Sequence, residues 1–171
     1  MAVVNVKATA LTNRDTSPVV LSNDAIAKGR VNAATGVVAC TSGDSIASTY
    51  RFCSIPSNAR PTSILVACDA LGGTTAGTID IYDTTLNGGA IVATTGTKCL
   101  NGGISLVSAL AGSEAFGGGT SAAGYTPGNG EKFLWQVLGL SADPNKYYDV
   151  VLTLTAAVTS TGNVRMNVEY V

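Results

Sequence analysis

Residues able to carry out chemistry are few in this chain. Histidine is absent from all 171 residues, which removes the most common general base and the Ser–His and Cys–His pairs of nucleophilic catalysis. The sequence also lacks the Gly-x-Ser-x-Gly segment that presents a nucleophilic serine on a sharp turn. We therefore expect no catalytic residues, and a protein that is not an enzyme.

One glycine-rich segment, GYTPGNGEK at 124–132, resembles a phosphate-binding loop in composition. Such a loop needs glycine before its lysine, where Glu131 stands, and serine or threonine after it, where Phe133 follows Lys132. The segment therefore does not predict nucleotide binding, and no cofactor-binding residue is expected.

Three carboxylates could be brought together by one predicted hairpin, namely Asp69, Asp80 and Asp83. Grouped carboxylates can act as paired acid and base or can bind calcium. Aspartates at strand ends more often shape turns, and the spacing of an EF-hand loop is absent. We expect turn-forming aspartates and no metal site.

The four cysteines are Cys40, Cys53, Cys68 and Cys99. None has the Cys-x-x-Cys spacing of zinc or redox sites, so we expect buried, apolar thiols. The alternative is a disulfide, for which Cys53 and Cys68 are candidates because they lie in adjacent apolar runs. A disulfide needs an oxidising compartment, and the first residues lack the basic start of a signal peptide.

The aromatic residues offer a limited case for sugar binding. Tyr147 and Tyr148 are adjacent, and adjacent residues of a strand point to opposite faces, so only one of them could stack on a sugar. Trp135 lies in a helical pattern and is expected in the core or in a lid rather than on a ligand.

The composition indicates which partners to expect. Charged residues make up only 12% of the chain and the net charge is −1, whereas soluble domains average about 25% charged residues. A surface this poor in charge predicts a protein covered by other proteins; the alternative is a monomer kept soluble by its hydroxyl groups. Nucleic acid and membrane are not expected partners, because neither clustered basic residues nor a long apolar run occurs.

Alternating apolar and polar residues predict an antiparallel β protein. In the segment 163–171, Val164, Met166, Val168 and Tyr170 face inward and Arg165, Asn167 and Glu169 face outward; in 149–158, Val150, Leu152 and Leu154 face inward and Val151, Thr153 and Thr155 face outward. These two segments predict one hairpin, and 63–70 with 77–83 a second. Further strands are expected at 3–10, 36–40, 48–55 and 89–94.

One helix is expected at 131–140, where Phe133, Leu134, Val137 and Leu138 share a face and would plug one end of the fold. The segment 100–130 predicts a long connection with at most one helical turn at 106–110, either reaching a neighbouring subunit or without a role. Residues 1–30 predict an edge strand or an extended N-terminal arm. Together these elements predict a single domain over 1–171, an all-β antiparallel sandwich of jelly-roll type with one short plug helix; a partly closed barrel is the alternative.

Several segments in order resemble small structural proteins of tailed bacteriophages, the capsid decoration or cement proteins. They are YRFCSIPSNARPTSILVACDAL, GTIDIYDTTLNGGAIV, LWQVLGLSADPNKYYDVVLTLTAA and the last strand, which together cover nearly all of 50–171. These features belong to the scaffold, and no catalytic residue comes with the resemblance.

The resemblance implies a non-enzymatic virion protein that binds the capsid exterior, bridges subunits of the major capsid protein and forms a dimer or trimer. It would be made in the host cytoplasm and act on the virion. Two alternatives stay open: a tail, neck or fibre component of the same virion, and a carbohydrate-binding jelly-roll module.

Overall fold

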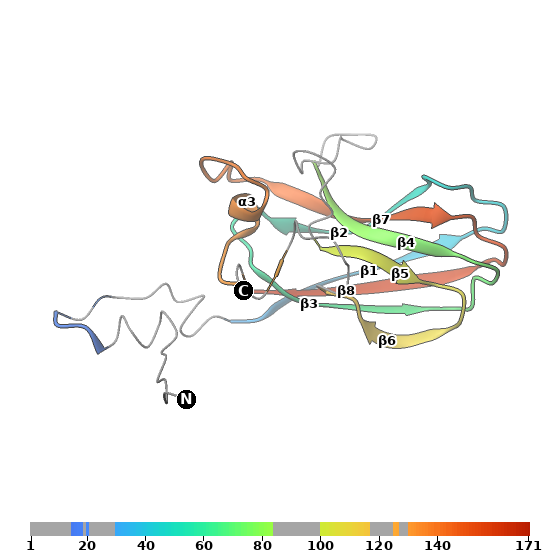
Figure 1. Cartoon of the computed structure of the whole chain (residues 1–171), viewed down its shortest axis with the longest axis horizontal. Helices are drawn as coiled ribbons and strands as arrows, with labels where there is room; N and C mark the ends of the chain where they lie inside the picture. Colours follow the sequence, from blue (N-terminus) through green and yellow to red (C-terminus); the bar gives the residue numbers. More distant parts are fainter. Residues whose placement is uncertain (1–14, 19, 21–29, 84–99, 117–124, 127–129) are drawn as a thin grey trace, which may run out of the picture.

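The described residues of the computed structural model form two antiparallel sheets that face each other (Figure 1). The structure describes residues 15–18, 20, 30–83, 100–116, 125–126 and 130–171. Sheet I has the strand order β1 (Asn32–Cys40), β8 (Gly162–Tyr170), β3 (Pro61–Cys68) and β6 (Leu110–Glu114). Sheet II has the order β2 (Thr49–Pro56), β7 (Tyr147–Ala156), β4 (Ala76–Asp83) and β5 (Asn101–Ser105).

The strand order is that of a jelly roll. The paired strands include β1 with β8, β2 with β7, β3 with β6, and β4 with β5, as in a doubled ribbon of strands that folds across itself into two sheets. This arrangement confirms the predicted all-β antiparallel sandwich.

Both predicted hairpins are wrong. β3 and β4 lie in opposite sheets, and so do β7 and β8, because each connection crosses the end of the sandwich instead of folding back within one sheet. The two connections pack against each other there, where Thr159 and Ser160 both donate their backbone N–H to the carbonyl oxygen of Leu71, at 3.2 and 2.8 Å. Alternation reveals which face of a strand is buried, but it does not identify the neighbouring strand.

The segment 100–130 also differs from the prediction. Its described part contains strands β5 and β6, and residues 106–109 between them do not form the predicted helical turn. Leu106 is fully buried and donates its backbone N–H to Thr75 O at 2.9 Å. The glycines and alanines of this segment gave no clear alternation. The strands expected at 3–10 and 89–94, and most of the expected arm, lie outside the described residues.

The inner faces of β7 and β8 are as predicted, but the outer face of β7 is not. The predicted inward residues of β7 and β8 are buried, except that Tyr170 is half-buried. Val151 was expected to face solvent, but it is fully buried, opposite Asp80, of which only 2% is exposed. The centre of the outer face of sheet II is therefore covered, which alternation alone cannot reveal.

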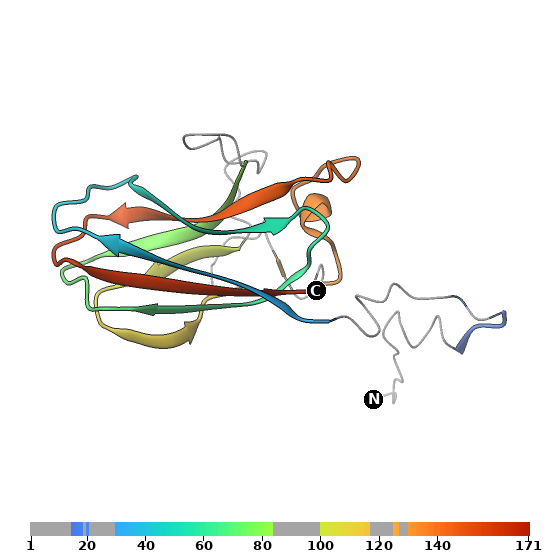
Figure 2. The ribbon, with the colours of Figure 1, turned by 180° about the vertical axis from the view of Figure 1, so that it is seen from behind.

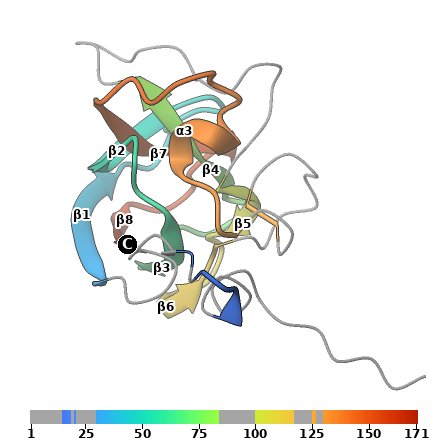
Figure 3. The same ribbon diagram turned by 90° about the vertical axis from the view of Figure 1, so that its left-hand side faces the viewer.

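Helix α3 (Leu134–Val137) closes one end of the sandwich, as predicted (Figure 3). Leu134 and Leu138 are buried, and the N–H groups of Leu134 and Trp135 donate to Ala59 O and Ser57 O at 2.8 and 3.0 Å. The helix is shorter than the segment 131–140, because Phe133 before it is extended and Gly139 after it, with φ of 73°, leaves the helical conformation. Trp135 is half-buried. No helix among the described residues could span a membrane.

Strands β1 and β2 meet at one edge of the sandwich (Figure 2). Gly36 makes this contact possible, because a Cβ atom there would lie 2.0 Å from the carbonyl oxygen of Phe52. The absence of a side chain at Gly36 therefore lets the two sheets approach along this edge.

We expect Gly36→Ala to lower the free energy of unfolding by about 1–3 kcal/mol, because backbone must shift to admit the methyl group. Gly103→Ala is the control: its Cβ would meet no atom within 4 Å, so stability should be unchanged or raised by up to about 1 kcal/mol. Urea unfolding of the two variants measures the difference. Equal stability of both variants would contradict the proposed contact.

Candidate functional site: a neutral pocket at the end of the sandwich

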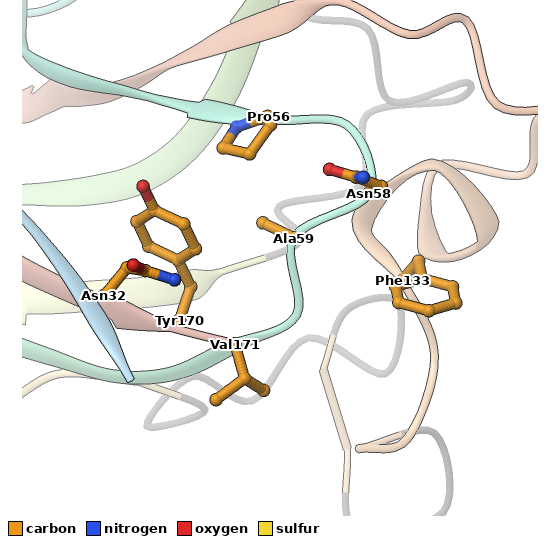
Figure 4. A pocket seen from close by; sticks show the side chains of 7 residues that line it. All are labelled: Asn32, Pro56, Asn58, Ala59, Phe133, Tyr170 and Val171. Atoms are coloured by element: carbon orange, nitrogen blue, oxygen red, sulfur yellow. The ribbon is translucent and has the colours of Figure 1, made fainter. Parts of the chain in front are cut away.

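A pocket of about 340 Å³ opens at the end of the sandwich that α3 closes (Figure 4). It lies where β1 begins and β8 ends, beside the turn from β2 to β3. The residues that line it are Asn32, Pro56, Asn58, Ala59, Phe133, Tyr170 and Val171. They come from four separate segments, so no spacing in the sequence could have indicated the pocket.

Side-chain and backbone hydrogen bonds hold the turn that forms one wall of the pocket. Ser57 is buried, donates its hydroxyl to Asp143 Oδ1 at 2.5 Å, and accepts the backbone N–H of Lys146 at 3.2 Å. Arg60 and Val171 exchange two backbone hydrogen bonds of 2.8 and 3.1 Å. The pocket is thus preformed in its described part.

The side chains that line the pocket are uncharged. Tyr170 and Phe133 supply aromatic rings, Asn32 and Asn58 supply amides, and none of the seven lining residues carries a charged side chain. Figure 4 shows Tyr170 near Pro56 on one side and Phe133 beyond Asn58 on the other, so the two rings do not form a parallel clamp. Such a pocket suits a small uncharged ligand with hydroxyl groups and an apolar face.

A second hollow, of about 290 Å³, lies on sheet II beside the β-bulge between Arg51 and Cys53. An Arg51 guanidinium N–H donates to the carboxylate of Asp149, whose side chain is only 12% exposed. Arg51 lies opposite Val151 and Asp149 opposite Ser54, and the two side chains pair diagonally across β2 and β7, so both charges of this hollow already have a partner.

The described thiols are unreactive. Cys40, Cys53 and Cys68 are free, so the alternative of a disulfide between Cys53 and Cys68 is wrong. Cys40 and Cys68 are buried as predicted, whereas Cys53 is half-buried. Burial, with a smaller contribution from the Asp149 carboxylate, raises the pKa of Cys53 to about 11. Burial likewise raises the pKa of Cys40 and of Cys68. At neutral pH these thiols are protonated and are poor nucleophiles. Cys99 lies outside the described residues.

The three candidate carboxylates do not converge. Asp69 accepts the backbone N–H of Asn163 at 2.8 Å and shapes a turn. Asp80 is buried on the outer face of β4, and Asp83 pairs with Lys146 Nζ at 2.5 Å. Among the described residues, no group of three potential metal ligands occurs.

The tyrosines lie as the alternation of a strand requires. Tyr147 is 59% exposed and Tyr148 is 1% exposed, which confirms that they point to opposite faces. Tyr125, from the glycine-rich segment 124–132, is buried, and its ring lies 5.3 Å from that of Phe116. The described part of this segment thus contributes to packing.

Comparisons with known proteins include a structural likeness to a phage capsid chain. No family model matches the chain, and no curated protein sequence matches it. The fold is similar to a chain of the cyanophage Pam1 capsid asymmetric unit, with a TM-score of 0.43 and 19% sequence identity, over 83% of this chain and 84% of that chain.

The two ion pairs of sheet II should differ in their contribution to stability. Arg51→Ala leaves the nearly buried Asp149 carboxylate without its partner, and we expect a loss of about 1–3 kcal/mol in the free energy of unfolding. Lys146→Ala is the control, because the Lys146 and Asp83 side chains are 37% and 30% exposed and such pairs contribute about 0–1 kcal/mol. Urea unfolding tests the order, and a larger loss for Lys146→Ala would contradict it.

Proposed function

We propose that this protein is a non-enzymatic virion structural protein, a decoration or cement protein that binds the exterior of a phage capsid and bridges its major capsid subunits. The observation that carries the proposal is a jelly roll with few ionised groups and several exposed apolar side chains, among them Val37 at 62% and Ile46 at 64% exposure. The resemblance of residues 50–171 to decoration proteins supports the same function.

The loop from β1 to β2 is the part of the surface best suited to contact a shell. Its Ile46 is exposed, while the loop is fixed to the sandwich by bonds from Gly43 N to Val158 O and from Ala47 N to Leu154 O, both 2.9 Å. A rigid loop loses little conformational entropy on binding, which favours an exposed apolar anchor at its tip.

Weak single contacts are sufficient for this role. A shell presents many equivalent sites, so a protein that bridges two subunits gains affinity through effective concentration. Binding only the assembled shell stabilises that state by mass action. A tail, neck or fibre component of the same virion would need the same kind of surface and would differ only in its location.

A carbohydrate-binding module is the second candidate, and the end pocket favours it. The ring of Tyr170 with the amides of Asn32 and Asn58 provides an apolar face and hydrogen-bonding groups without charge. Neutral sugars require this combination of groups, and the pocket is open in the described part of the chain.

Co-sedimentation with expanded capsids assembled from the major capsid protein of the same phage tests the first candidate. We expect the protein to pellet with the shells, and Ile46→Ser to reduce binding about tenfold while Ser45→Ala in the same loop does not. Removing a central apolar anchor commonly has an effect of this size.

A glycan array with the same protein separates the candidates. Absence of capsid binding together with glycan binding that Tyr170→Ala abolishes would replace the first function by the second. Thermal unfolding of each variant ensures that a loss of binding does not reflect a loss of fold.

A further inference from the structure

The residues on the outer face of sheet I are exposed or half-buried, and few of them are charged. Val37 on β1 lies opposite Arg165 on β8, and Leu65 on β3 lies opposite Asn167. Val37 is 62% exposed, although isolated valines of this kind are common on surfaces. Apolar exposure alone therefore does not identify a binding partner for this face.

Two opposite charges stand on β8 at the centre of this face. Arg165 and Glu169 alternate with buried residues and point outward, and neither has an ion-pair partner in the described part of the chain. Their Cα atoms are four residue steps apart along the strand, about 13 Å, which is too far for an ion pair between them. Asn167 lies midway between them.

We propose that this face binds the same face of a second copy about a two-fold axis. The axis lies between the two sheets, perpendicular to their strands, and passes at Asn167. This operation brings Arg165 of each copy opposite Glu169 of the other, so that both charges find partners. An axis parallel to the strands would instead place Arg165 against Arg165, so the charges select one of the two arrangements.

The ends of β3 follow the same pattern. Asp69 is hydrogen-bonded to Asn163 and Arg60 to Val171, so the two lie level with positions equally far from Asn167 along β8. The same axis therefore brings Asp69 of one copy toward Arg60 of the other.

A fifth charge, Glu114 on β6, lies level with Asn167 at the rim of the face. Its carboxylate turns back to the sheet, where it accepts hydrogen bonds from Ser63 Oγ, Ile64 N and Phe116 N at 2.7, 3.0 and 2.8 Å. Partial burial opposes the charge, but these bonds outweigh it and hold the pKa of Glu114 below its usual value. Its two copies would face each other at the solvent-exposed rim, where salt screens their repulsion.

The size of the face sets the expected strength of the dimer. The strands β1, β8, β3 and β6 contain nine, nine, eight and five residues. At about 3.3 Å per residue and about 4.8 Å between strands they span on the order of 500 Å², below the roughly 800 Å² per partner of a standard stable interface. We expect a reversible dimer with a dissociation constant in the micromolar range. On a shell, a dimer would present two capsid-binding surfaces, and in this respect alone the inference rests on the proposed function.

Sedimentation velocity over a concentration series, without capsids, tests the dimer. The unmodified protein should shift from monomer to dimer, whereas Arg165→Glu and Glu169→Arg should each remain monomeric, because each single reversal opposes like charges. An equimolar mixture of the two variants should dimerise, because all four facing positions are then complementary. The double variant Arg165→Glu/Glu169→Arg should dimerise as well.

Glu131→Arg, an exposed reversal that lies outside sheet I, is the control and should leave the dimer intact. A wild-type protein that stays monomeric, single variants that still dimerise, or a mixture that does not associate would each overturn the proposal. Circular dichroism verifies that every variant is folded. Because no shell is present, failure here leaves the capsid-binding proposal untouched, and failure to bind capsids leaves the dimer untouched.

Discussion

The arrangement of consecutive strands in opposite sheets is the constraint on which the rest of the structure depends. From β1 to β4 and again from β5 to β8, each strand lies in the other sheet from the one before it, so the connections between them cross an end of the sandwich. Their backbone groups must then find partners at those ends. The bonds of Thr159 and Ser160 to Leu71 and the closure of the other end by α3 satisfy this need.

The alternation of apolar and polar residues predicted which face of a strand is buried, but it did not predict how the strands are arranged. Alternation identified the inner faces of β7 and β8, because burial repeats every two residues. It did not identify the neighbours of a strand, so the predicted hairpins were wrong. Alternation also failed for β5 and β6, where glycine and alanine leave no apolar signal, and for Val151, which is buried although it points to the outer face of sheet II. The absence of histidine can be read directly from the sequence. The end pocket cannot, because its lining residues come from four segments that are distant in the sequence.

The outer faces of the two sheets treat charge differently. On sheet II, the nearly buried Asp149 has Arg51 as its partner, in keeping with the high cost of an isolated buried charge. On the outer face of sheet I, Arg165 and Glu169 remain without partners in the described part of the chain. On a surface with few charges, each charge has a larger influence on the orientation in which two molecules bind. Specificity of assembly can then come from a small number of residues, while neutral side chains provide the contact area.

The register of β1 with β8 has a mechanical consequence. Asn32 pairs with Tyr170, so the start of β1 and the end of β8 lie side by side. A force that pulls the start of β1 away from the end of β8 would break the hydrogen bonds between the two strands one after another, and each break would need only a low force. A load carried between opposite ends of the sandwich would instead shear many bonds at once. The direction of tension, and not only its size, would decide whether the fold withstands it.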